Sequence, residues 1–557
     1  MKIKIVVFII LIFITGTVFA NPFDMILYDD PVIEDIRFLS LETGRTFLSF
    51  SPPFALGELE NFLKSIDPST LSPAANDAYI RIEERLTPKA ALSYSEEIFS
   101  VYFDLTVSLE AELRLNSDIK WKNDYPIPPP LISAPIRFNF SKYAQIYADP
   151  QIYADLRYHG EEIFETNLPI INGHLEEYVP LRAYGALGGS WWNFMIGREN
   201  YFWGSGNTGS LIFNANSQFY DFARLTVFSE NFKYTILVNH SPIWINESLM
   251  HNYFGTDPNW NDSDGDYLKN SMNRHFYMHR LDFRLFKRLS ISLMEGVMIG
   301  NAPLDILYLN PITVFHSLSA WLNYDPWGPV EKRYPDKGGS MVGSFLGIEI
   351  NWNITKSFSF YGQLVMNEFA LPGELEKSEP EPPNALGYMA GLQYSHSFNE
   401  HWAGVFYIDA IYTDPYLFNL GSPYSSMFYM RYPNSSIDYF GYPRDTFALT
   451  LGAKLNNNNR LFLTGSLAWI AKGQKDSQGN KGIWWDWDQT AEARLESTPT
   501  GIVNHKIVLS LSARWKLFPY LTIGGNLTGI VSLNNNHSLG EDRTGAQLSL
   551  YVSYHLK

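Results

Sequence analysis

The last thirteen residues of the chain, 545–557, alternate between apolar and polar side chains without a break. Successive side chains of a β-strand point to opposite faces, so one face of this segment is apolar and the other is polar. Residues 103–115 repeat the pattern over another thirteen positions. Strands of soluble proteins usually have about 5 or 6 residues, whereas a tilted strand that crosses membrane hydrocarbon needs about 9 to 11. Both segments are therefore typical of transmembrane β-strands.

The same alternation recurs along most of the chain and predicts about 18 strands. The candidate strands are 103–115, 133–140, 144–157, 180–188, 191–198, 222–229, 233–240, 277–286, 290–299, 340–351, 357–367, 386–396, 402–413, 446–455, 460–470, 505–515, 521–531 and 546–556. Short connections such as 189–190 tend to alternate with long ones such as 241–276. An open sheet edge in lipid leaves backbone groups unpaired, so the strands are expected to close into a barrel.

We therefore predict an all-β fold, a transmembrane antiparallel β-barrel of about 18 strands over residues 101–557 with long extracellular loops. The alternative architecture is a soluble β-propeller or β-helix, although the sequence shows no repeat period. Charged residues of both signs fall on the polar faces, among them Arg280, Asp282 and Glu349. This mixture predicts salt-bridged packing inside a filled barrel rather than an ion filter of one sign.

Residues 1–20 have the layout of a secretory signal, with Lys2 and Lys4 before an apolar run and small Ala20 at its end. The alternative is a short membrane anchor. Residues 21–100 are expected to form a periplasmic segment with two short helices. Apolar residues recur at helical spacing from Leu56, and Ser72 precedes Pro73 as an N-cap would. These helices, within 54–87, are interpreted as a plug or packing cap for the floor of the barrel.

The composition narrows the partners of the chain. It has no cysteine, which excludes disulfides and thiolate metal sites, and its formal net charge of −16 argues against nucleic acid and anionic lipid surfaces. Its 34 Tyr, 38 Phe and 15 Trp residues suit the aromatic girdles of a membrane barrel. A large soluble β-protein or a carbohydrate-binding protein also carries many aromatic residues, so this count does not separate the three.

Residues 197–216 carry a more specific pattern, in which a Gly197-Arg198 strand end leads into Trp203-Gly204-Ser205-Gly206 and then Asn207-Thr208-Gly209-Ser210-Leu211. This pattern resembles the capsule assembly protein Wzi family, although Ser205 stands where that family usually has proline. Asn310-Pro311 and the order of parts, a signal, short helices and then a barrel, are also similar. The resemblance implies an outer-membrane lectin that binds capsular or related surface polysaccharide and helps to assemble or retain it, without enzymatic activity or a cofactor.

Two segments hold the candidate polysaccharide-binding residues. The first is the glycine-rich loop, with Arg198, Glu199, Trp203 and Asn207 as candidates; its alternative role is a constriction loop without a ligand of its own. The second supplies aromatic rings beside a carboxylate, which suit the apolar face and the hydroxyls of a sugar, in Trp484, Trp485, Asp486 and Trp487. The alternative for this segment is an interfacial aromatic belt.

A further loop is dense in oxygen donors and offers Asp262, Asp264 and Asp266 as calcium ligands, although it departs from the EF-hand template. A solvated acidic loop is the alternative. The expected location is the outer membrane, and the expected partners are polysaccharide, outer-membrane lipid and polysaccharide export machinery. Two rival functions remain at this point, a porin for small solutes and a lipid-modifying enzyme with His240 in its site.

Overall fold

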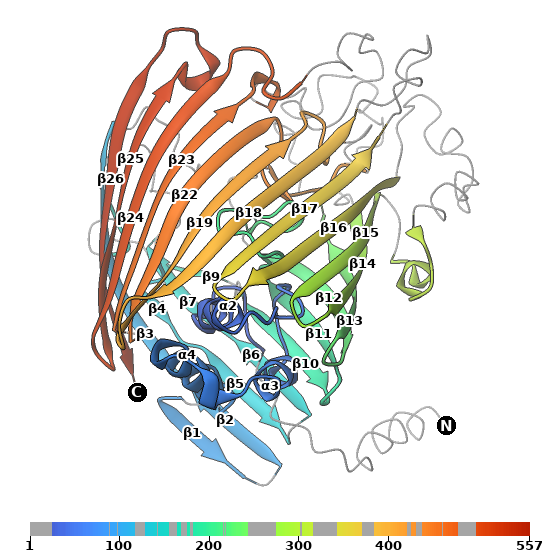
Figure 1. The fold of residues 1–557 in the computed structure, drawn as a ribbon, viewed down its shortest axis with the longest axis vertical. Coiled ribbons are helices and arrows are strands. Elements are labelled where there is room, and N and C mark those ends of the chain that lie inside the picture. The colour runs from blue at the N-terminus through green and yellow to red at the C-terminus, as the bar shows by residue number, and fades with distance from the viewer. Residues whose placement is uncertain are drawn as a thin grey trace.

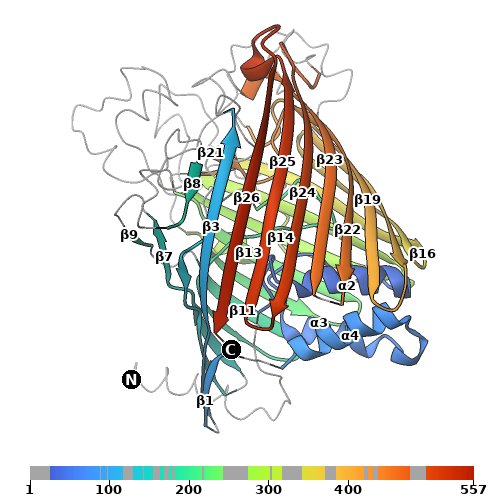
Figure 2. The same cartoon turned by 90° about the vertical axis from the view of Figure 1, so that its left-hand side faces the viewer.

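The computed structural model of the chain describes residues 25–87, 90–96, 98–116, 129–141, 143–154, 164–168, 175–178, 182–215, 217, 219–242, 274–300, 304–315, 342–369, 384–419, 425–430, 437–458, 460–476 and 497–556. The signal expected at 1–20 lies outside these residues. A single antiparallel sheet of 24 strands dominates the described part, and it curves into the tall barrel seen in Figures 1 and 2.

The strands of this sheet are β1 Leu92–Ser95, β2 Phe99–Phe103, β3 Leu105–Leu115, β4 Ile132–Ser133, β5 Ile136–Phe140, β6 Ala144–Ala148, β7 Gln151–Ala154, β8 Phe164–Thr166, β9 Leu175–Tyr178, β10 Ala183–Gly188, β11 Trp192–Glu199, β12 Tyr220–Phe228, β13 Phe232–His240, β14 Arg274–Leu285, β15 Leu289–Gly300, β16 Val342–Thr355, β17 Phe358–Glu368, β18 Ala385–Ser397, β19 Trp402–Thr413, β22 Thr446–Asn457, β23 Leu461–Lys472, β24 Asn504–Phe518, β25 Leu521–Leu533 and β26 Arg543–Leu556. A separate hairpin consists of β20 Phe428–Met430 and β21 Ile437–Tyr439. Short 3-10 helices lie at η1 Pro68–Thr70, η4 Ile306–Leu309, η5 Gln474–Asp476 and η7 Asn535–His537.

The sheet closes on itself because its last strand pairs with one of its first. β26 runs antiparallel to β3, from Ala546 opposite Leu115 to Leu556 opposite Leu105. From β10 onward each strand of the wall pairs with its neighbour in sequence, apart from the step from β19 to β22. Closure removes the two free edges that an open sheet of wall strands would have, as an apolar surrounding requires. The predicted antiparallel barrel is thus confirmed.

Several of the 24 strands are pieces of one wall strand. β2 pairs with β5 and β3 with β4, while β6 pairs with β10 and β7 with β9. The consecutive strands therefore lie end to end in four couples, which are β2 with β3, β4 with β5, β6 with β7 and β9 with β10. Among the described residues, β1 pairs only with β2, and β8 pairs only with β3. Counted in this way, the described residues form 18 wall strands, in agreement with the sequence prediction.

The sequence did not predict the breaks within these wall strands. Pro135 separates β4 from β5, and Pro150 separates β6 from β7 at the facing position. Proline has no backbone N–H to donate, so a ladder cannot run through it unbroken. The sheet also begins at Leu92, earlier than the expected start at 101, because β1 and β2 form a short hairpin without a long alternating run.

The outer surface of the wall is apolar, and the predicted faces are confirmed on the last strand. Leu548, Leu550 and Val552 are exposed on the outside, whereas Ser549 between them is 4 % exposed. The same outward side chains recur on β24, where Leu509 and Leu511 are exposed. A continuous apolar exterior of this kind suits contact with hydrocarbon rather than with water.

Three helices gather at the end of the barrel where the short turns and the C-terminal end lie: α2 Val32–Thr43, α3 Leu56–Lys64 and α4 Pro73–Arg85. The last two are the predicted helices, and the Ser72 hydroxyl accepts a hydrogen bond from Ala75 N at 3.3 Å as an N-cap does. None of the helices in the described part has the length and apolarity that a membrane-spanning helix requires.

The helix α2 was not predicted. Its Ile36 and Leu39 are fully buried, and even Arg37 is only 7 % exposed. A helix that is buried on nearly all sides lacks the polar face by which an amphipathic helix is recognised. The helix signal that α2 does carry is at its C-terminal end, where Gly44 adopts a left-handed φ of 67° directly after the last turn.

Candidate functional site

The segment after β11 turns into the barrel and forms a hairpin inside it. We call residues 200–215 the inner loop. Its two arms are joined by hydrogen bonds from Trp203 N to Phe213 O and from Ala215 N to Tyr201 O, both at 3.0 Å. The side chains of Tyr201, Trp203 and Phe213 are completely buried. The inner loop is therefore part of the core that fills the lumen, not a loop at the surface.

The N-terminal segment and the inner loop hold each other in place. The Trp203 indole donates a 2.7 Å hydrogen bond to Pro52 O, and Gly204 N donates one of 2.8 Å to Phe50 O. A side chain at Gly204 would be strained here, because a Cβ would lie 2.3 Å from Gln363 Nε2 and the φ is +142°. The two segments thus form one plug.

Arg37 strengthens this plug from α2. Its Nη1 lies 2.5 Å from Ser205 O and its Nη2 lies 3.2 Å from Gly204 O. The guanidinium also covers the Phe50 ring at 4.7 Å from its centroid. Because these carbonyl oxygens are buried, they need donors, and a single arginine supplies both.

The tip of the inner loop is fixed to the opposite wall by one carboxylate. Asp409 on β19 accepts hydrogen bonds from Asn207 N at 3.1 Å, Thr208 N at 2.9 Å and Thr208 Oγ1 at 2.8 Å. The Tyr361 hydroxyl on β17 donates to the same carboxylate. Asn207 in turn donates through Nδ2 to the Tyr361 oxygen at 3.0 Å. The inner loop therefore spans the lumen from the end of β11 to the strands β17 and β19.

Buried charges are paired beneath the loop. Arg280 lies 2.8 Å from Asp282 and 3.2 Å from Glu349, with the guanidinium fully buried. Gln363 connects this group to the plug, since its amide donates to Glu349 at 3.1 Å and to Trp203 O at 3.0 Å. The salt-bridged packing expected from the sequence is present in this half of the lumen.

The other two candidates, Arg198 and Glu199, lie at the end of β11, directly before the inner loop. Arg198 pairs with Asp221 through two hydrogen bonds of 2.8 and 3.0 Å and stacks over the Phe219 ring. Glu199 is 0 % exposed and accepts from Arg182 Nε at 3.1 Å and Asn200 N at 2.8 Å. Arg198 and Asn207 remain partly exposed, whereas Glu199 and Trp203 have no surface for a ligand in this conformation.

The remaining candidates lie outside the described residues. They are the aromatic segment with Trp484, Trp485, Asp486 and Trp487, and the calcium candidates Asp262, Asp264 and Asp266. The structure places four candidates, Arg198 and Glu199 at the end of β11 and Trp203 and Asn207 in the inner loop, and each of them has its own separate contacts.

One side of the lumen differs from the rest. Inward side chains on β12 and β13 are completely covered by the plug, as with Thr226 and Lys233 at 0 % exposure. On β23 and β25 the inward side chains Thr464 and Asn526 are exposed, although they lie at comparable positions inside the wall. The plug thus fills one half of the barrel and leaves the other half accessible to water.

Small polar side chains line this accessible half in two rows that cross the strands in register. We call them the polar wall: one row runs through Thr464, Ser512 and Asn526, and the other through Ser466, Ser510, Thr528 and Gln547. Neighbouring strands lie about 4.8 Å apart, so hydroxyl and amide groups recur at that interval. These residues were not among the sequence candidates, because polar side chains that alternate with apolar ones are expected on every wall strand.

A pocket of about 380 Å³ lies at the foot of the polar wall, between the wall and the helices α2 and α4. Lys454 and Glu34 form an ion pair of 3.0 Å at its edge, and Arg81 holds Asp35 at 2.7 Å. Burial raises the pKa of the Asp35 carboxyl above its ordinary value, although the Arg81 guanidinium opposes this shift.

No family model matches the chain, and no curated protein sequence matches it. Among solved structures, the chain is similar to Wzi of Escherichia coli, described as a carbohydrate-binding β-barrel involved in group 1 capsule assembly, with 13% sequence identity and a TM-score of 0.57 over 95% of this chain and 98% of that one. Outer-membrane channels match less well: OccD1 (OprD) with 10% identity and a TM-score of 0.39 over 82% and 95%, and DcaP of Acinetobacter baumannii with 11% identity and 0.33 over 84% and 100%. The first of these likenesses extends over nearly the whole of both chains, and it shows that the two share the fold of a closed antiparallel β-barrel.

Proposed function

We propose that the chain is an outer-membrane barrel that binds capsular or related surface polysaccharide and helps to assemble or retain it at the cell surface. The observation that carries the proposal is the division of the lumen. A bonded plug blocks one half, while the polar wall leaves hydroxyl and amide groups accessible in the other half. A porin for small solutes requires a lumen that is open across its whole width, whereas the plug fills half of this one.

The chemistry of the polar wall suits sugars. Each sugar ring carries several hydroxyl groups that donate and accept hydrogen bonds, and Ser, Thr, Asn and Gln side chains do the same. Two parallel rows offer many weak contacts to a polymer, and contacts made in series on one chain raise the overall affinity. Further proposed contacts are the aromatic segment Trp484–Trp487 and the partly exposed Arg198 and Asn207. Aromatic rings stack on the apolar face of a sugar, and guanidinium and amide groups form hydrogen bonds with its hydroxyls.

The orientation follows from the same geometry. The plug helices and the C-terminal end lie at the end with the short turns, which in outer-membrane barrels is the periplasmic end. The polar wall then faces the cell exterior through the long-loop end. In this orientation the N-terminal segment lies where polysaccharide export machinery would meet the barrel, and Glu199 and Trp203 keep the inner loop in place instead of touching the polymer.

Two measurements test the proposal. Cells that lack the protein are expected to release surface polysaccharide into the medium, and the wild-type copy is expected to restore retention. The purified barrel in a planar bilayer is expected to show no large, stable openings. Unchanged retention together with large openings would support the porin and remove the proposal.

A further inference from the structure

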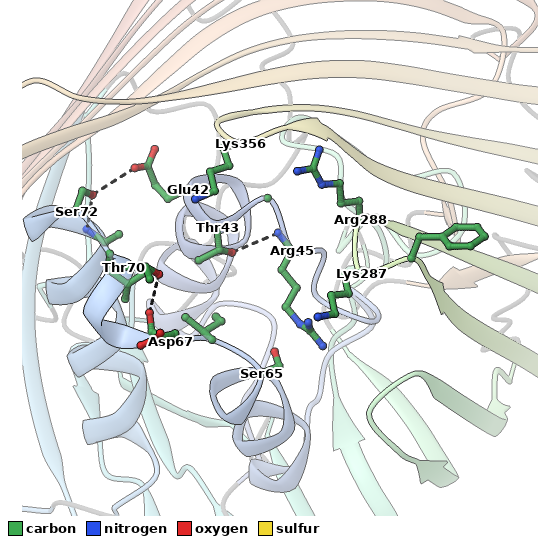
Figure 3. A pocket seen from close by; sticks show the side chains of 15 residues that line it. Glu42, Thr43, Arg45, Ser65, Asp67, Thr70, Ser72, Lys287, Arg288 and Lys356 are labelled. Carbon is green, nitrogen blue, oxygen red and sulfur yellow. Dashed lines mark hydrogen bonds between the residues drawn. The ribbon is translucent and has the colours of Figure 1, made fainter.

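A second pocket, of about 330 Å³, opens at the short-turn end where the plug meets the wall (Figure 3). Its lining comes from the end of α2, from the segment before α4 and from the turns between β14 and β15 and between β16 and β17. None of the polar-wall residues lines it. The pocket is therefore separate from the proposed polysaccharide surface.

Four cationic side chains and two carboxylates line this pocket, although the whole chain has a net charge of −16. Arg45 follows α2, Lys287 and Arg288 belong to one turn, and Lys356 belongs to the other. Figure 3 shows the side chains of Arg45 and Lys287 converging from different elements. A local excess of positive charge on an acidic protein indicates an anionic ligand.

The two carboxylates do not neutralise these cations. Glu42 accepts hydrogen bonds from the hydroxyls of Ser395 at 2.6 Å, Ser357 at 3.0 Å and Ser72 at 3.3 Å. Asp67 accepts from the backbone N and the hydroxyl of Ser69 at 3.0 and 2.7 Å. Within the described part of the chain, neither carboxylate forms an ion pair with a cation of the pocket.

Arg45 provides a second, independent sign of a missing partner. Its side chain is 9% exposed, and its Nη2 pairs with Glu230 at 2.6 Å. Its buried Nε has no acceptor among the described residues. A buried N–H without an acceptor costs about 1–3 kcal/mol, so the Arg45 guanidinium is left with unused capacity to donate a hydrogen bond beside the pocket. Unlike Arg45, which pairs with Glu230, Lys287 and Lys356 form no ion pair with a carboxylate in the described ranges.

We propose that this pocket binds a phosphate group, held by Arg45, Lys287, Arg288 and Lys356. The several oxygens of one phosphate match several cationic donors on separate elements, and arginine and lysine are the usual cationic partners of phosphate. A lipid headgroup is the favoured source. Phe286, which also lines the pocket, is 90% exposed beside Lys287 at the end of a wall strand, and exposed aromatic rings at strand ends lie at membrane interfaces.

The test uses the purified full-length barrel in a neutral detergent without phosphate buffer. Calorimetric titrations compare dioctanoyl-phosphatidylglycerol, glycerol 3-phosphate and dioctanoylglycerol, which lacks phosphate. The double variant Lys287→Gln/Lys356→Gln removes two exposed cations and leaves the ion pair of Arg45 intact. Arg460→Gln, in the turn between β22 and β23 and outside the lining, is the matched control.

We expect phosphatidylglycerol to bind, the double variant to weaken this binding by about tenfold or more, and the control to remain within about twofold of wild type. Tighter binding of the lipid than of glycerol 3-phosphate supports the lipid source, and equal binding of the two overturns it in favour of soluble phosphates. Binding of dioctanoylglycerol as tight as that of the phospholipid, an unaltered affinity in the double variant, or no binding of either phosphate compound overturns the site. None of these results bears on polysaccharide binding, so the two proposals stand or fall separately.

Discussion

Lys233 Nζ lies 2.6 Å from Glu58 Oε2, and their side chains are 0% and 5% exposed. This ion pair joins the wall strand β13 to the plug helix α3, far from each other in sequence. Glu58 also accepts a hydrogen bond from Ala55 N at 3.0 Å, at the start of the same helix. The pair is thus one of the points at which the plug is held in the filled half of the lumen.

Lys233→Met is expected to destabilise the barrel by about 3–5 kcal/mol, because it leaves the Glu58 carboxylate buried without its cation. The midpoint of thermal unfolding in detergent, followed by circular dichroism, measures the loss. The double variant Lys233→Met/Glu58→Gln is expected to recover a large part of it, since glutamine is neutral and still accepts from Ala55. If the double variant is no more stable than the single one, the ion pair is not what holds α3 to the wall.

Trp203→Phe is expected to cost about 2–4 kcal/mol of stability, because the buried Pro52 carbonyl loses its donor and the core loses volume. Polysaccharide binding per folded molecule is expected to stay the same, since Trp203 is 0% exposed. Trp191→Phe, at a position 54% exposed, serves as the control for stability. A folded Trp203 variant that has lost polysaccharide binding would instead show that the inner loop opens to meet the polymer.

Asn526→Trp is expected to weaken polysaccharide binding severalfold, because a large side chain in the middle of the polar wall covers the hydroxyl rows around it. The next residue, Leu527, is 44% exposed on the outer face of the same strand, so Leu527→Phe changes size without changing the lumen. Binding isotherms of the two variants should therefore differ. Equal affinities in both would place the polymer elsewhere.

The raised pKa of Asp35 predicts a dependence of stability on pH. A carboxyl whose pKa is higher in the folded state than in the unfolded chain contributes stability at acidic pH, and this contribution is lost as the pH rises through the folded value. The unfolding midpoint of wild type relative to Asp35→Asn should therefore fall as the pH rises above the ordinary pKa of aspartate, about 3.9. A difference that rises over this range would mean that the pairing with Arg81 outweighs burial.

The sequence predicted the wall of the barrel well because the wall is governed by one local rule. Lipid outside and polar groups inside impose a period of two, and the alternation of Leu548, Leu550 and Val552 with polar residues records it directly. The strand number follows from counting such segments. The breaks in the wall strands at Pro135 and Pro150 were not predicted, because they come from the missing backbone N–H of proline and not from the alternation.

The plug was predicted much less completely because it depends on contacts between distant segments. The helices α3 and α4 carry local signals, whereas α2 is buried on nearly all sides and was missed. Nothing near Trp203 indicates that its indole meets Pro52, or that Asp409 receives Asn207 and Thr208. The glycine-rich motif was noticed for its composition, and its buried position became evident only from the fold.

The polar wall escaped notice for the opposite reason. Serine and threonine on the inner face of a barrel strand, such as Ser510 and Thr464, are ordinary at the level of sequence. These residues matter because the plug fills only one half of the lumen and leaves them exposed in the other. No local sequence pattern encodes that exposure.

The most direct test of the account is an equilibrium binding isotherm of the purified, detergent-folded barrel with surface polysaccharide extracted from the source cells. We predict saturable binding, which Asn526→Trp weakens severalfold and Leu527→Phe leaves unchanged. No binding by the folded wild-type barrel, at polymer concentrations that would saturate a lectin, would contradict the account.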